Sequence, residues 1–167
     1  MDLGGDVVAK FTYKGSAELA KKLDRLGAAT IPTVKKALFA RASIIADKIR
    51  QNIHLLPEEK WRYLKPGEMF HGVPANQKKD LLDSLGITKV RFSDDGFWNI
   101  KVGFDGYGSF STRKYPKGLP NQLLARSIES GSSVRAKHPF SRPAVQMVKN
   151  RAMDAMQEVI NEAFERA

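Results

Sequence analysis

The sequence contains no cysteine, which excludes disulfide bonds, thiolate metal ligands and cysteine nucleophiles together. Histidine is scarce as well, and His54, His71 and His138 fall in different segments without the spacing of paired zinc ligands. No apolar run approaches the ~20 residues needed to span a bilayer. The first five residues lack the basic and apolar parts of a signal peptide. We therefore expect no metal, no cofactor, no membrane contact and a cytoplasmic origin.

Groups arranged for catalysis are also absent from the pattern. The acid pairs Glu58-Glu59 and Asp94-Asp95 are sequence neighbours, which cannot face one another across a cleft as an acid and base pair. The glycine-rich residues 103–108 are not followed by the Gly-Lys-Ser/Thr of a phosphate-binding loop. No serine lies in a G-x-S-x-G elbow. The sequence therefore predicts a protein that is not an enzyme.

Basic residues are in excess, since 28 Lys and Arg stand against 18 Asp and Glu, for a formal charge of +10. Eight of the basic residues and only two acids lie between Lys101 and Arg142. Such a field attracts either the phosphates of nucleic acid or an acidic protein surface. A solvated, solubilising surface is the simpler interpretation of the same charge.

At 167 residues the chain is the size of one domain. Hydrophobic periodicity predicts a short strand over residues 7–13, a short helix ending at Gly27, and a longer helix over residues 30–52. A second long helix is expected from Pro143 to near the end, with an apolar stripe that starts at Val145. Asp94-Asp95-Gly96 between two β-rich runs predicts a hairpin over residues 87–104. Residues 81–85 and 125–131 are expected to form short helical turns.

These elements predict an α+β domain in which a small antiparallel sheet packs against two long helices. Two stretches interrupt it. Residues 55–78 hold three prolines and several aromatics and are expected to form a long inserted loop. Residues 105–122 are rich in glycine, serine and basic side chains and are expected to form a mobile loop.

The most informative stretch joins the short helix over residues 125–131 to the C-terminal helix. Gly131 is suited to end a helix, and Pro139 and Pro143 stiffen the backbone around Phe140 and Arg142. The sequence therefore predicts a rigid basic strap with one aromatic anchor, suited to positioning rather than chemistry. Phe140 either fills a pocket on a partner or packs in the core of its own chain.

Four motifs in order resemble the neck, or tail-completion, proteins of long-tailed, HK97-type bacteriophages. They are FTYKG at residues 11–15 with Leu19 and Leu23, the helix over residues 30–52, KDLLDSL at residues 79–85, and the pair IESGS and HPFSRPA at residues 128–132 and 138–144. The resemblance covers nearly the whole chain, and the final pair is its most specific part.

The resemblance implies a non-enzymatic virion protein at the head–tail junction, present in the host cytoplasm during assembly. It implies a ring, expected to be a hexamer, that contacts other neck and tail proteins such as the tail terminator, the head-completion or stopper protein and the tail tube. The implied subunit or partner interface lies in the strap, at Glu129, Gly131, Arg135, His138, Pro139, Phe140, Arg142 and Pro143. The basic residues Arg113, Lys114 and Lys117 are expected to face packaged DNA without sequence specificity, or an acidic partner.

Two other classes remain open from the sequence. The basic segments with interleaved aromatics suit a small nucleic-acid-binding protein, although no recognisable nucleic-acid-binding module is present. A toxin-like or regulatory interaction module is the third class.

Overall fold

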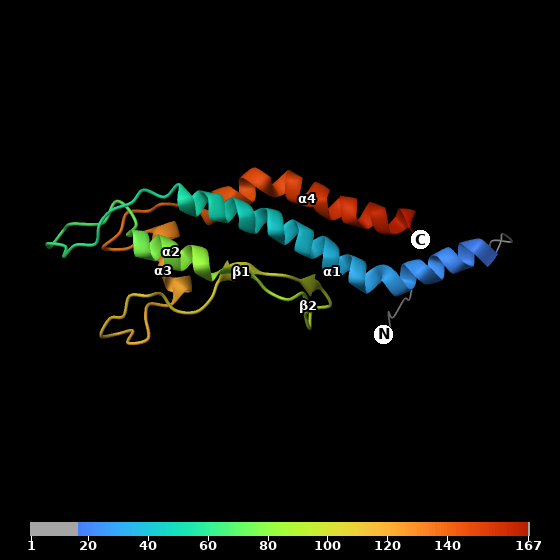
Figure 1. Ribbon diagram of the computed structural model, residues 1–167, viewed down its shortest axis with the longest axis horizontal. Helices are drawn as coiled ribbons and strands as arrows, with labels where there is room; N and C mark the ends of the chain where they lie inside the picture. The colour runs from blue at the N-terminus through green and yellow to red at the C-terminus, as the bar shows by residue number, and fades with distance from the viewer. Residues whose placement is uncertain (1–16, 167) are drawn as a thin grey trace, which may run out of the picture.

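The computed structural model describes residues 17–166 and shows an elongated molecule built around two long helices. In Figure 1 the helices α1 (Ala17–His54) and α4 (Ser141–Glu165) lie side by side, and the β-hairpin lies on the other side of α1. The α+β class predicted from the sequence is confirmed. The strand predicted over residues 7–13 lies outside the described residues.

Helix α1 is one continuous element, so the predicted break at Gly27 and the fresh start at residue 30 are wrong. Gly27 costs a helix only about 1 kcal/mol, and Pro32 lies inside the helix rather than at its start. A proline removes one backbone hydrogen bond and bends the axis rather than necessarily ending it. Figure 1 shows α1 changing direction in its blue N-terminal part, as a proline kink would produce.

Helix α4 packs along α1. Helix α4 buries Ala144, Val148 and Ala152, and α1 buries Ala37, Ala42, Ala46, Ile49 and Ile53. Helix α4 begins at Ser141 and not at Pro143, and its first buried residue is Ala144. Val145, predicted to start the apolar stripe, is 40% exposed, and Met153 and Phe164 are also exposed.

The hairpin forms where the Asp-Gly turn predicts it, in two short ladders. Strand β1 (Leu85–Ile87) pairs with β4 (Val102–Phe104), and β2 (Arg91–Phe92) pairs with β3 (Trp98–Asn99), all antiparallel. Between the ladders three residues of the first arm, 88–90, stand opposite two of the second, 100–101, and this extra residue interrupts the pairing. Gly96 turns the chain with a φ of 82°.

Two short helices complete the fold at the end of the molecule that carries the loops. Helix α2 (Ala75–Ser84) begins directly after Pro74, so residues 75–78 belong to a helix and not to the predicted loop insertion. Helix α3 (Asn121–Ser130) begins directly after Pro120 and is correspondingly longer than the predicted turns. Gly86, which follows the helical turns predicted over residues 81–85, lies inside β1.

The core gathers where α1, α2, α3, the β1–β4 ladder and the start of α4 converge. Ile53, Leu81, Leu124, Ile128 and Phe140 are its largest fully buried side chains. The sheet contacts α1 along its length, and it meets the beginning of α4 through the rings of Phe104 and Phe140, 5.9 Å apart. The strap between α3 and α4 therefore passes directly over the core.

Candidate functional site

The strap, defined here as residues 131–140, is fixed by hydrogen bonds on both sides. On one side it pairs with the loop over residues 55–74, because the Phe70 N–H donates to the Val134 carbonyl and the Ala136 N–H donates to the Phe70 carbonyl. On the other side the His138 N–H donates to the Ile128 carbonyl of α3. Backbone hydrogen bonds therefore anchor the strap to its neighbours on both sides.

Glu129, near the end of α3, binds the first turn of α4. Its carboxylate accepts the backbone N–H groups of Phe140, Ser141 and Arg142 at 2.9, 2.8 and 3.1 Å. The Ser141 hydroxyl donates to the same carboxylate. The first N–H groups of a helix have no partner within the helix, and a negative charge there complements the helix dipole. One carboxylate thus caps α4 from a different helix.

The charge of Glu129 is maintained although its side chain is buried. Burial acts to raise the pKa of this carboxyl, but the hydrogen bonds from Ser141, Phe140 and Arg142 together outweigh it, so the pKa lies below its ordinary value. An ionised carboxylate with four donors has no spare capacity for a catalytic or metal-binding role. Glu129 therefore positions the strap and α4.

Gly131 ends α3 in a conformation that other residues rarely adopt, with a φ of 76°. A Cβ built here would lie 3.2 Å from both the Arg135 carbonyl oxygen and the Lys137 nitrogen. The glycine is required twice, by its backbone angle and by the close approach of the strap. Its role, like that of Glu129, lies within its own chain.

Arg135 belongs to the strap and is buried, with only 8% of its surface exposed. Its guanidinium donates to the Gln77 side-chain oxygen at 2.7 Å and lies over the ring of Phe70. Burial lowers the pKa of Arg135 from its ordinary value, and the charge of Glu59 acts in the opposite direction. Arg135 therefore ties the strap to α2 and the 55–74 loop and presents little surface to a partner.

Phe140 packs in its own core, the second of the two roles that the sequence allows. It is 2% exposed, and the side-chain amide of Asn52 on α1 donates to its carbonyl at 2.9 Å. Among the predicted interface residues, Pro139 and Arg142 remain exposed, and His138, Pro143 and Gly131 are half-buried. The strap surface open to another chain is thus narrower than the sequence suggests.

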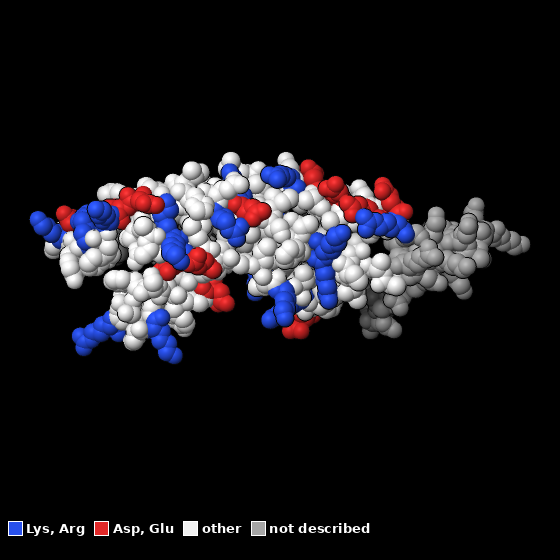
Figure 2. Space-filling model, viewed as in Figure 1, with Lys and Arg blue, Asp and Glu red and all other residues white. Residues whose placement is uncertain are grey.

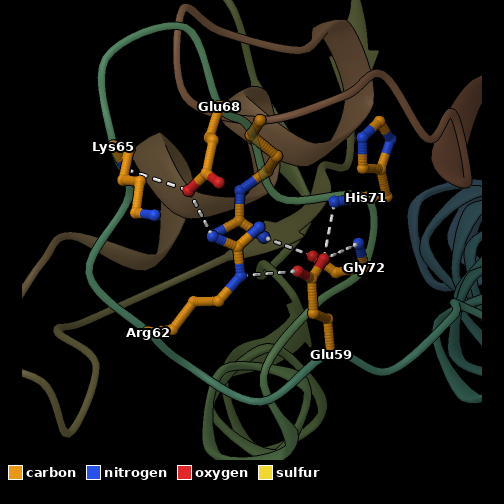
Figure 3. Close-up of polar contacts among 7 residues, drawn as sticks. Glu59, Arg62, Lys65, Glu68, His71 and Gly72 are labelled. Atoms are coloured by element: carbon orange, nitrogen blue, oxygen red, sulfur yellow. Dashed lines mark hydrogen bonds and ion pairs between the residues drawn. The ribbon is translucent and has the colours of Figure 1, made fainter.

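The loop over residues 55–74 is held by its own charged network, drawn in Figure 3. The Glu59 carboxylate accepts the N–H groups of His71 and Gly72 at 2.6 and 3.0 Å. Arg62 bridges Glu59 and Glu68, which in turn accepts the Lys65 N–H. The His71 hydrogen bond is the main cause that lowers the pKa of Glu59, and the Lys65 hydrogen bond lowers that of Glu68.

The second loop, residues 105–120, carries the basic residues Arg113, Lys114 and Lys117, all exposed and apart from the strap. Hydrogen bonds hold its base, where the Gly108 N–H donates to the Leu119 carbonyl and Asp80 of α2 accepts from Ser109. A Cβ at Gly118 would lie 2.1 Å from the Gly108 oxygen. Lysine and arginine side chains project from the loop-bearing end of the molecule in Figure 2.

An aromatic cluster joins the two loops. The ring of Trp61 lies 4.6 Å from that of Tyr63 in the first loop and 5.8 Å from that of Phe110 in the second. Tyr63 is 87% exposed, and all three rings reach the surface. The cluster therefore places an aromatic surface beside the basic loop.

An open groove of about 980 Å³ lies between the base of the hairpin, α3 and the start of α4. Three basic residues line it, Lys101, Arg126 and Arg142, and none of them has an ion-pair partner among the side chains of residues 27–166. The lining also holds two carboxylates, Glu129, which is saturated by four donors, and Asp105, which accepts the N–H of Gly106. Three cations against two carboxylates leave the groove with a small excess of positive charge.

The groove and the charged loop network are the parts of the site that sequence reasoning misses. Glu59 stands in an adjacent acid pair that carries no spacing signal, although Trp61 and Tyr63 mark the loop as more than a disordered linker. Gly86 and Gly103 line the groove as direct partners across the β1–β4 ladder. Two glycines facing one another across a hairpin would have been a usable signal.

Nothing in the described part of the chain resembles a metal centre, since no three His, Asp or Glu side chains gather around one point. None of the helices in residues 17–166 is both long and apolar enough to cross a membrane. Comparison with protein-family models, with curated proteins and with solved structures finds no match to this chain.

Proposed function

We propose that this chain is a structural component of the head–tail junction of a long-tailed bacteriophage, where copies of it form a ring that joins the tail to the head connector. The proposal rests on the resemblance of the IESGS and HPFSRPA motifs to the neck, or tail-completion, proteins. Glu129 and Gly131 from the first motif and Phe140 from the second lie together in the fold, where they fix the direction of α4.

The observation that carries the proposal is the distribution of exposed apolar side chains. Monomeric soluble proteins rarely leave large apolar patches open to water, and such patches mark contacts with other chains. Here the exposed rings of Trp61, Tyr63 and Phe110 form one such patch. Further large apolar side chains are exposed on both long helices and at the hairpin, including Phe39, Phe92, Phe97, Met147 and Phe164. A ring component is covered by neighbours on several sides, and this surface suits such surroundings.

The polar groups support the same conclusion, because the buried ones hold the backbone. Glu129 caps α4, Arg135 ties the strap to Gln77, and the Lys78 ammonium donates to the carbonyls of His54 and Leu56. Side chains arranged in this way stabilise one shape. They suit a protein that holds others in position and does not turn over substrate.

Complementation tests the proposal directly. A phage that lacks a functional copy of this gene should accumulate filled heads and separate tails, and the chain supplied in trans should restore joined particles. Electron microscopy and plaque counts give the readout. Joined, infectious particles formed without the gene would overturn the proposal.

A nucleic-acid-binding protein is the second candidate, favoured by the aromatic cluster beside the basic loop. Aromatic rings stack on bases, and neighbouring cations bind the phosphates. Trp61, Tyr63 and Phe110 supply the rings, and Arg113, Lys114 and Lys117 supply the charge. Tight binding to DNA at physiological salt, without any self-association, would favour this candidate over the ring.

A further inference from the structure

We propose that the groove between the hairpin base, α3 and α4 receives the hairpin turn of a second copy of this chain. The inference rests on the proposed function, because it names the contact through which neighbouring copies would form the ring. The hairpin turn is defined here as residues 93–97. The turn carries two acidic side chains, a conformation held by hydrogen bonds, and an exposed aromatic ring, and each of these suits the basic, open groove.

The first argument is the unexplained pair of glycines that line the groove. Gly86 and Gly103 are direct partners across the β1–β4 ladder, and nothing lies within 4 Å of a Cβ built on either of them. Neither has a positive φ. Glycine weakens a strand interior and often marks a place where another backbone or a ligand approaches closely. Nothing in the described part of the chain requires these two glycines, so a contact from another chain explains them.

The second argument is charge complementarity. The hairpin turn carries Asp94 and Asp95, both exposed and without an ion-pair partner in the described part of the chain. The groove carries the free cations Lys101, Arg126 and Arg142. Opposite charges arranged in this way fix the register of a contact and suppress wrong partners.

The third argument is the shape of the turn. Hydrogen bonds from Ser93 to the Phe97 carbonyl, through both its N–H and its hydroxyl, hold the turn in one conformation. Phe92, just before the turn, and Phe97, its last residue, are 59% and 71% exposed. A pre-formed turn loses little conformational entropy on binding, and its two rings would be removed from water.

The contact must join different copies, because the groove is lined by the base of the hairpin, residues 86–88 and 101–105, and the turn lies at the other end of the same hairpin (Figure 1). The turn therefore cannot fold back into the groove of its own chain. A contact between two different surfaces is heterologous, and successive heterologous contacts close into a ring when the rotation allows. Each copy would give its turn to one neighbour and receive a turn from the other.

Cysteine cross-linking gives the first test, and the absence of native cysteine makes it clean. A chain carrying both Asp95→Cys and Arg142→Cys should form a ladder of disulfide-linked multimers when the concentrated protein is oxidised. Each single variant should give dimers at most. In the control Lys149→Cys, on the exposed face of α4, replaces Arg142→Cys and should give no ladder. A double variant that forms no more multimers than this control would overturn the inference.

Charge substitution gives the second test, in the full-length chain. Asp94→Asn with Asp95→Asn keeps the turn chemistry and removes both charges, and it should raise the protein concentration needed for assembly about tenfold. Asp154→Asn with Glu158→Gln removes two exposed charges from α4 and should leave assembly unchanged. Asp94→Lys with Asp95→Lys should be rescued by Arg126→Glu with Arg142→Glu. Failure of this rescue, with both chains folded, would contradict the inference.

The variant Gly103→Val distinguishes the loss of the contact between copies from the loss of folding. Valine suits a strand, so the variant should melt at a higher temperature than the wild type and yet fail to assemble. The tests also separate the inference from the proposed function. If the gene is needed to join heads to tails but the cross-linking ladder is absent, only the inference fails. If the ladder forms while particles join without the gene, only the function fails.

Discussion

The carboxylate of Glu129, near the end of α3, accepts the backbone N–H of Ser141, the first residue of α4, at 2.8 Å. This single contact joins the two motifs on which the family resemblance depends. It explains why an acid stands shortly before the strap, since no side chain of the strap itself caps α4. The pair IESGS and HPFSRPA is thus one structural unit, whatever the chain binds.

Replacing Glu129 by alanine should destabilise the protein by about 1–3 kcal/mol, because the buried N–H groups of Phe140, Ser141 and Arg142 lose their acceptor. The free energy of unfolding, measured by urea denaturation, gives the readout. Glu158→Ala, on the exposed side of α4, is the matched control and should change stability by less than about 0.5 kcal/mol. An equal loss in both variants would show that the cap contributes nothing.

The same carboxylate makes stability depend on pH. The pKa of Glu129 is lower in the folded protein than its ordinary value of 4.5, so its contribution is complete above that pH. The contribution is lost as the pH falls through the lower folded pKa. The difference in unfolding free energy between wild type and Glu129→Ala should therefore shrink below about pH 4. A difference that stays constant down to pH 2 would contradict the ionised cap.

Two glycines should respond in opposite directions to alanine. Gly131→Ala should cost about 1–2 kcal/mol, because its φ is 76° and the new Cβ would crowd the Arg135 carbonyl. Gly27→Ala should stabilise by about 0.5–1 kcal/mol, because Gly27 lies inside α1 with open space around it. Thermal melting of both variants checks this. A stabilised Gly131→Ala would show that the strap is not held as described.

Phe140→Ala should destabilise by about 3–5 kcal/mol, as large aromatic truncations in a core do. Phe140→Leu keeps most of the apolar volume and should cost much less, which makes it the useful variant for assembly experiments. If Phe140→Ala unfolds at the same urea midpoint as the wild type, the Phe140 side chain is not part of the core of the free chain.

The basic loop predicts a measurable salt dependence if it contacts DNA. The slope of log K against log salt is negative, and each phosphate contact removed reduces its magnitude by about 0.9, so losing three contacts should reduce it by about 2.7. The test compares, by fluorescence anisotropy on duplex DNA, the wild type with a chain in which glutamine replaces Arg113, Lys114 and Lys117.

The control removes three exposed charges elsewhere, by glutamine at Lys36, Lys149 and Arg151. An equal decrease in slope for both variants would show only the effect of net charge. No measurable DNA binding by the wild type would leave the acidic partner as the remaining role of the loop.

The parts of the fold that sequence reasoning predicts are those with strong local signals. Asp95-Gly96 predicts the turn because few residue pairs adopt its backbone, and the spacing of Ile45, Ile49 and Ile53 predicts the buried side of α1. Gly27 and Pro32 mislead because their local preference is weaker than the propagation of a long helix. The starts of α2 and α3, after Pro74 and Pro120, are missed because the backbone there is held by distant residues, through the hydrogen bonds from Val73 to Pro57 and from Asn121 to Gly106.

In the candidate site, too, the features set by local backbone preference can be predicted and those set by distant contacts cannot. Gly131, Pro139 and Pro143 predict the strap, because glycine and proline act on their own backbone. The partners of Arg135 and Glu59 cannot be predicted this way, since Gln77 and His71 reach them only after the chain has folded. The groove is likewise a product of tertiary packing, with a lining drawn from both long helices, α3 and the hairpin.

The Glu129 cap also sets the direction in which the whole of α4 points. Twenty-five residues make this helix about 37 Å long, so a tilt of about 5° at Glu129 would swing its far end by about 3 Å. Where identical subunits meet around a circle, such angular errors accumulate from one subunit to the next. A few hydrogen bonds at one carboxylate would then decide whether the circle closes.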